Sequence, residues 1–189
     1  MKIDNYIDGV FVKPSSGEYL DNIDPSIGKK YGQIPKSNDN DVADAIRSAK
    51  KAFPTWSKLT SLDRSNHLMR VADRIEQRLE ELALAESKDN GKPLKVARAV
   101  DIPRAVDNFR FFASAILHEN SEIHDLGDNG FNYTLRRPVG VVACISPWNL
   151  PLYLFTWKIA PALAAGNTVV AKPSEITPAT AFLLSTILD

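Results

Sequence analysis

Polar side chains of complementary chemistry follow two apolar runs in the last third of the chain. Residues 140–145 lead to Asn149, and residues 168–171 lead to Lys172 and Glu175. Both runs are rich in β-branched residues, and a helix-like segment separates them. This order predicts a βαβ unit with parallel strands and a right-handed crossover. The amide, ammonium and carboxylate would then follow the carboxyl ends of neighbouring strands, where a nucleotide can bind and a carbonyl can be polarised.

Two short runs carry a resemblance to a known family. Ile-Ser-Pro-Trp-Asn at residues 145–149 and Lys-Pro-Ser-Glu at residues 172–175 resemble the aldehyde dehydrogenase superfamily, and the resemblance covers nearly all 189 residues. It implies NAD as the cofactor, bound on a modified Rossmann-like fold, although the sequence has no Gly-x-Gly-x-x-Gly fingerprint. It also implies that the nucleophilic cysteine and the general-base glutamate come from sequence beyond residue 189. We therefore expect the 189-residue chain alone to be inactive.

The resemblance gives Asn149 a catalytic role. Its amide would stabilise the oxyanion that forms when a thiolate adds to an aldehyde. The alternative is an asparagine that forms a turn and caps the next helix. Pro147 and Trp148 would shape the cofactor or aldehyde channel, although core packing would also explain a tryptophan there.

The resemblance assigns further residues to NAD. In the family, the matching lysine and glutamate contact the hydroxyls of the adenosine ribose, and the carboxylate favours NAD by repelling the extra phosphate of NADP. The alternative for Lys172 and Glu175 is an exposed surface pair. The full set of expected cofactor-binding residues is Ile145, Ser146, Pro147, Trp148, Lys172, Ser174 and Glu175.

Arg104 is a candidate for substrate binding. The segments 86–94, 101–104 and 108–113 are similar to family members that oxidise 2-hydroxymuconic or 2-aminomuconic semialdehyde. Those substrates carry a carboxylate, and arginine is a natural bidentate partner for it. A solvated arginine on a helix face is the alternative.

Cys144 is the only cysteine, and it lies inside an apolar run. No neighbouring histidine or cation would lower the pKa of its thiol, so a buried, inert thiol is the preferred interpretation over a nucleophile.

Composition excludes several other classes of protein. Lys plus Arg and Asp plus Glu both total 23, so the net charge gives no reason to expect nucleic acid or an anionic membrane as a partner. With 44% hydrophobic residues, no apolar leader and no membrane span, the sequence predicts a globular protein of the cytoplasm. Three scattered histidines and one cysteine predict neither a metal site nor an internal disulfide.

The elements before this unit are mostly helical. We expect strands at 6–12 and 19–23, a helix over 38–53 closed by Pro54, and a second helix from about 60 to 90. A third helix over 94–118 should restart or kink at Pro103. A surface connection over 120–130, a strand over 131–137, and a last helix from Pro178 capped by Thr177 complete the prediction.

The predicted fold is α/β with three parts. We expect residues 1–130 to form a strand and helical region. The resemblance implies that residues 131–138 are a strand of the oligomerisation type and that residues 139–189 are the first βαβ of an incomplete Rossmann-like NAD-binding domain. We expect the first part of an NAD-dependent semialdehyde dehydrogenase that acts on a small aldehyde and is a homo-oligomer when complete. A noncatalytic nucleotide-binding or assembly module and an unrelated α/β domain are the alternatives.

Overall fold

Two antiparallel hairpins begin the molecule. The computed structural model describes residues 1–188, and in it β1 (Asn5–Ile7) pairs with β2 (Val10–Val12) and β3 (Tyr19–Asp24) pairs with β4 (Lys29–Pro35). The prediction of one strand over 6–12 was wrong, because Asp8 and Gly9 both adopt positive φ, of 56° and 79°. Two central residues with positive φ form a tight hairpin turn, and Asp-Gly favours that conformation.

The side chain of the residue that precedes each of the first two helices caps its first turn. Asn38 forms a capping box with Asp41 at the start of α1 (Asp39–Trp56), and Thr60 accepts the N–H of Asp63 at the start of α2 (Ser61–Gln77). The predicted end of the first helix at Pro54 was wrong. Proline removes a single donor there, and the Ser57 N–H still donates to the Phe53 carbonyl at 2.9 Å, so the last turn stays closed.

The predicted second helix over 60–90 is two helices. The backbone of Arg78 leaves the helical region, with φ −104° and ψ 20°, and α3 (Leu79–Asn90) follows it. Neither glycine nor proline marks this break. After it, α3 contacts both β3 and α7 (Ala179–Ser185), and Gly91 ends it in the left-handed conformation, with φ 79°.

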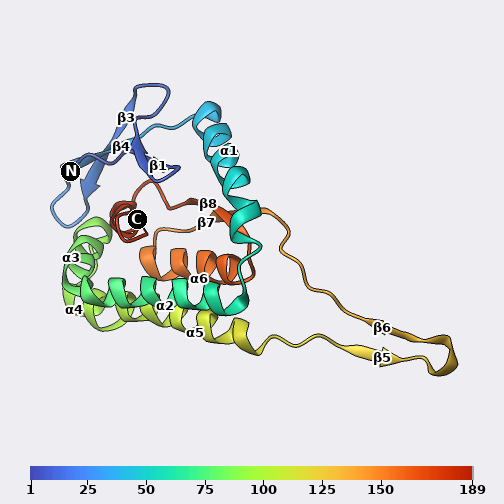
Figure 1. Ribbon diagram of the computed structural model, residues 1–189. Helices are drawn as coiled ribbons and strands as arrows, with labels where there is room; N and C mark the ends of the chain where they lie inside the picture. The colour runs from blue at the N-terminus through green and yellow to red at the C-terminus, as the bar shows by residue number, and fades with distance from the viewer. Residues whose placement is uncertain (189) are drawn as a thin grey trace.

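Pro103 starts a new helical segment, as predicted. A short helix α4 (Leu94–Val96) and a π-helical turn (Ala97–Asp101) lead into α5 (Ile102–Ala115), and a 3₁₀ turn (Ile116–His118) follows. Helix α5 packs against both α2 and α6 (Pro151–Ala164), and these two helices also contact each other (Figure 1). The largest fully buried apolar side chains come mostly from these helices: Phe109, Leu68, Ile75, Leu82, Ile102, Leu152 and Leu184.

The predicted βαβ unit is confirmed. Strand β7 (Val141–Ile145) pairs in parallel with β8 (Thr168–Lys172), and α6 connects them. The unit lies against the helical body and beside α1 (Figure 1), so the mixed α/β fold is confirmed as well. The predicted cap by Thr177 was wrong, since α7 has no side-chain cap and the buried hydroxyl of Thr177 has no hydrogen-bond partner.

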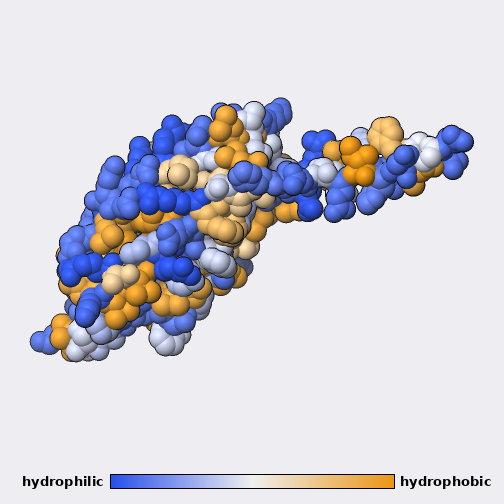
Figure 2. All heavy atoms as spheres, turned by 90° about the horizontal axis from the view of Figure 1, so that it is seen from below, coloured by the Kyte–Doolittle hydropathy of each residue, from blue (hydrophilic) through white to orange (hydrophobic). Residues whose placement is uncertain are grey.

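An arm extends away from the body between α5 and β7 (Figure 1). It contains β5 (Ile123–Asp125), a 3₁₀ turn (Gly127–Asn129) and β6 (Phe131–Tyr133), and the two strands pair antiparallel. The predicted connection over 120–130 therefore holds a strand of its own, and the predicted strand over 131–137 ends at Tyr133. Figure 2 shows apolar side chains on this arm, and the side chains of Ile123 and Phe131 are 70% and 66% exposed.

Among residues 1–188, no helix has both the length and the apolar character needed to cross a bilayer.

Candidate cofactor and catalytic site

The ends of β7 and β8 bring the two predicted motifs to one edge. Ile145 pairs with Lys172, and the N–H of Ser146 donates to the carbonyl of Lys172 at 3.1 Å. The chain then leaves β7 through Pro147 and Trp148 and leaves β8 through Pro173 and Ser174. The carboxyl edge of a parallel pair is where open α/β folds bind ligands.

These segments contain both buried and exposed side chains. Ser146 and Ser174 are buried, whereas Ile145, Pro147 and Trp148 are exposed. Trp148 is 55% exposed and so does not belong to the hydrophobic core. Its exposed ring and the Ile145 side chain offer apolar surface to a flat ligand.

Lys172, the last residue of β8, forms an ion pair with Glu175. Lys172 Nζ lies 2.8 Å from Glu175 Oε2, and the two side chains are 60% and 61% exposed. The hydrogen bond from Lys172 holds the pKa of the Glu175 carboxyl below its usual range. The carboxylate is therefore ionised at neutral pH, in the form that accepts hydrogen bonds from hydroxyl groups.

The side chain of Asn149 is exposed and caps no helix. Helix α6 begins at Pro151 with Leu150 as its N-cap residue, and it has no side-chain cap. Within residues 1–188, the Asn149 carboxamide has no hydrogen-bond partner. The capping alternative for this residue therefore finds no support, and the amide is free to donate to a ligand.

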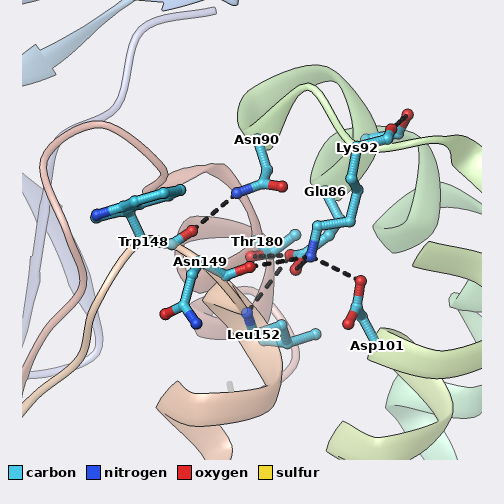
Figure 3. Close-up of polar contacts among 9 residues, drawn as sticks. Glu86, Asn90, Lys92, Asp101, Trp148, Asn149, Leu152 and Thr180 are labelled. Carbon is cyan, nitrogen blue, oxygen red and sulfur yellow. Dashed lines mark hydrogen bonds and ion pairs between the residues drawn. The ribbon is translucent and has the colours of Figure 1, made fainter. Parts of the chain in front are cut away.

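Four charged or polar residues that the sequence did not assign to a site form a network next to Asn149. Glu86, Asn90 and Lys92 contact the backbone of the segment from Trp148 to Leu152, and Asp101 pairs with Lys92 (Figure 3). The sequence held one indication of this network in Glu86. This charged residue lies three positions after the buried Ala83, on the same face of α3. A charge at such a position needs a partner inside the protein.

Arg104 lies on α5, next to the start of α6. Its Nη2 atom lies 3.4 Å from the Tyr153 hydroxyl, and its guanidinium carbon lies 5.5 Å from the centre of the Tyr153 ring. The hydrogen bond to Tyr153 raises the pKa of Arg104 above its ordinary value. No carboxylate of residues 1–188 forms an ion pair with Arg104, so most of its donors remain available to an anion.

Cys144 is buried in β7, as predicted, with 4% of its surface exposed. Burial raises the pKa of its thiol, which keeps it protonated and unreactive at neutral pH. Among the residues that the structure describes, no group of three or more His, Cys, Asp or Glu side chains could hold a metal ion.

The fold, the strand edge and the motifs define a class of protein. Residues 11–189 match the aldehyde dehydrogenase family, and the chain belongs to that family.

Individual relatives agree with this membership. The chain is 54% identical over 190 residues to 2-aminomuconic semialdehyde dehydrogenase of Homo sapiens, a match that covers 100% of this chain and 39% of the relative. It is 44% identical over 187 residues to an aldehyde dehydrogenase of Deinococcus radiodurans, covering 99% of this chain and 36% of the relative. The chain therefore spans about two fifths of the length of these relatives.

A solved structure gives the same result. The crystal structure of PnpE in complex with nicotinamide adenine dinucleotide superposes with a TM-score of 0.96 at 41% identity, over 100% of this chain and 39% of that chain. The resemblance to the aldehyde dehydrogenases, including those that act on semialdehydes, is confirmed.

Proposed function

We propose that this chain is the cofactor-side portion of an NAD-dependent dehydrogenase that oxidises a carboxylated semialdehyde to a carboxylic acid. The observation that carries the proposal is the register of β7 and β8. It places the free carboxamide of Asn149 and the ion pair of Lys172 and Glu175 after the same edge of the sheet. The name of the human relative and its 54% identity support a semialdehyde as the substrate class.

The residues at this edge fit a dinucleotide. Glu175 and Lys172 offer an ionised acceptor and a donor for the two hydroxyls of a ribose, and both side chains are exposed enough to be reached. Ser174 lies beside them in the sequence. The neighbouring segment at the end of β7 consists of Ile145, Ser146, Pro147 and Trp148. Bound NAD would supply a hydride acceptor.

Asn149 acts on the aldehyde in this proposal. Its amide donates a hydrogen bond to the carbonyl oxygen, and this bond strengthens as a nucleophile adds and negative charge develops on the oxygen. Because nothing within the described residues engages the amide, it does not have to break an internal hydrogen bond first. The amide is thus available to the carbonyl oxygen without the loss of another hydrogen bond.

Arg104 binds the carboxylate of the substrate. Its guanidinium is charged at all physiological pH values, and Tyr153 orients it without neutralising it. Tyr153 follows Asn149 by four residues, so the side chain that orients the anchor and the oxyanion donor lie on one stretch of chain. A substrate with an aldehyde at one end and a carboxylate at the other suits this arrangement.

The exposed arm supports a further part of the proposal, a homo-oligomer. The hairpin of β5 and β6 has two free edges and exposed apolar side chains, and such surfaces are commonly covered by a partner. The cytoplasmic location expected from the sequence stays part of this proposal.

The test is an assay of the dehydrogenase polypeptide that contains this chain. We expect NAD to be reduced in the presence of a carboxylated semialdehyde. Cofactor reduction should be slower when NADP replaces NAD, or when an aliphatic aldehyde of equal length replaces the semialdehyde. Binding of NAD without turnover of any aldehyde would favour a noncatalytic binding module instead.

A further inference from the structure

Three side chains from α3 and the turn after it bind the backbone on both sides of Asn149. Asn90 Nδ2 donates to the Trp148 carbonyl at 2.8 Å, and Lys92 Nζ lies 3.5 Å from the Asn149 carbonyl. Glu86 Oε2 accepts the N–H of Leu152 at 3.4 Å. We refer to Glu86, Asn90 and Lys92 together as the backbone clamp (Figure 3).

Lys92 is held in place by two buried carboxylates. Its Nζ atom lies 2.7 Å from Asp101 Oδ2 and 3.3 Å from Glu86 Oε1, and both carboxylate side chains are 0% exposed. Thr180 donates a further hydrogen bond of 3.0 Å to Glu86 Oε2. Interactions between charges are strong where water is excluded, so the ammonium has little freedom to move.

Adhesion between helices does not by itself account for this arrangement. Apolar residues of similar volume usually join helices at least as well as a buried ionic network does. Here the polar atoms of the network reach backbone groups of one short segment, Trp148 to Leu152, which lies 57 or more residues further along the chain. The network therefore fixes the path of that segment.

The side chain of Asn149 projects away from the clamp. Figure 3 shows its carboxamide pointing away from Lys92, while its backbone carbonyl faces the ammonium. The backbone of Asn149 is thus held on the clamp side, and the carboxamide is left free on the other side. A donor to a developing oxyanion has to be held to within a fraction of an ångström, and that requires support from surrounding residues.

We propose that Asn90 and Lys92 are positioning residues, which act through the backbone of segment 148–152 to fix the Asn149 amide for catalysis. The inference rests on the proposed function, in which that amide stabilises the oxyanion. The clamp holds the peptide groups on each side of the Asn149 α-carbon, so loss of a clamp contact lets the carboxamide rotate away from the reacting oxygen. The expected effect is on turnover and not on the binding of NAD.

The first test compares single variants of the dehydrogenase polypeptide that contains this chain. Asn90→Ala and Lys92→Met should each lower kcat by about tenfold or more, with an unchanged KM for NAD, because a small misplacement of a catalytic group has effects of that order. Lys92→Arg keeps the charge and should recover part of the lost turnover. Lys95→Met is the matched control, since Lys95 is exposed on the neighbouring turn, and its kcat should stay at the wild-type value.

Lys92→Met leaves two buried carboxylates without their cation, so this variant could fail to fold. Asn90→Ala then carries the test, because Asn90 is only partly buried and removal of its amide leaves no buried charge. An unchanged kcat for Asn90→Ala would overturn the inference.

The decisive readout is a double-mutant cycle with Asn149. If Asn90 acts through the Asn149 amide, Asn90→Ala should lower kcat in the wild type and cause no further loss in the Asn149→Ala variant. Equal fold losses in both backgrounds would show a general structural role and would overturn the inference while leaving the proposed function intact. An Asn149→Ala variant with wild-type kcat would overturn the oxyanion role itself, and the inference with it.

Discussion

Ile145 and Lys172 are direct partners in the parallel ladder of β7 and β8. Because of this register, the segment that carries Asn149 and the segment that carries Glu175 start from the same edge, although 26 positions separate the two residues. One of them presents a free carboxamide and the other an ionised carboxylate.

Glu175→Gln should narrow the preference for NAD over NADP. The substitution removes the negative charge that repels the extra phosphate of NADP but keeps a hydrogen-bonding group of the same size. The measurement is the ratio of kcat/KM for the two cofactors. Glu81→Gln is the control, since Glu81 also belongs to an exposed i,i+3 ion pair, with Arg78. A ratio that stays at the wild-type value in Glu175→Gln would remove Glu175 from the ribose site.

Arg104→Ala should raise the KM for a carboxylated semialdehyde by about tenfold or more, because a charge-assisted pair with the substrate is lost. The KM for an aliphatic aldehyde of the same length should change little. Arg98→Ala serves as the control, because Arg98 is exposed nearby and is already paired with Glu80. Equal changes for both substrates would assign Arg104 a structural role.

Glu86→Gln should change how stability depends on pH. Burial raises the pKa of the Glu86 carboxyl above its ordinary value of 4.5, although Lys92 partly opposes this effect. The folded protein therefore keeps this proton to a higher pH than the unfolded chain does. The stabilisation that results is fully present below pH 4.5 and is lost as the pH rises through the raised pKa.

The measurement is the free energy of unfolding of the wild type and of Glu86→Gln across this pH range. Their difference should decline as the pH rises above 4.5, with a limiting slope of about 1.4 kcal/mol per pH unit. For Glu81→Gln, the difference from wild type should instead decline as the pH falls. The hydrogen bond from Arg78 lowers the pKa of Glu81, and the stabilisation from the ionised carboxylate is lost when that carboxylate takes up a proton. A difference for Glu86→Gln that is flat or that grows with pH would contradict the account.

Phe131→Asp should weaken self-association through the arm. The Phe131 side chain is 66% exposed at the start of β6, and a charge there opposes its burial against another subunit. Light scattering should report a smaller mean molar mass for this variant. Ile27→Asp is the matched control, with an apolar side chain that is 62% exposed in the turn between β3 and β4. If Phe131→Asp and the wild type had the same molar mass, the arm would be excluded as the contact between subunits.

Features with a local pattern could be predicted from the sequence. The β-branched runs at 140–145 and 168–171, with a helix between them, predicted the parallel pair. Pro103 predicted the start of a helical segment for a similar reason, since its missing N–H is tolerated in a first turn. In contrast, the break at Arg78 has no local signal, and α3 meets its partners β3 and α7 only in the folded chain.

The candidate site divides in the same way. Asn149, Lys172 and Glu175 lie at or just after strand ends, so their motifs could be identified from spacing and resemblance. The backbone clamp could not be identified from the sequence. Glu86 and Lys92 contact backbone groups 66 and 57 positions further along the chain, and helical periodicity carries no information about such contacts. The charged side chain of Glu86 on the buried face of α3 was a sign that a distant partner existed.

The oxyanion role of Asn149 is tested most directly by the turnover of the Asn149→Ala variant of the dehydrogenase polypeptide that contains this chain. Asn120→Ala is the control, because Asn120 is an exposed asparagine that precedes the arm. We expect kcat to fall by about 10²-fold or more while the KM for NAD stays near the wild-type value, because the amide acts on the developing oxyanion and not on the cofactor. Wild-type kcat in Asn149→Ala, or a loss confined to the KM for NAD, would contradict the oxyanion role.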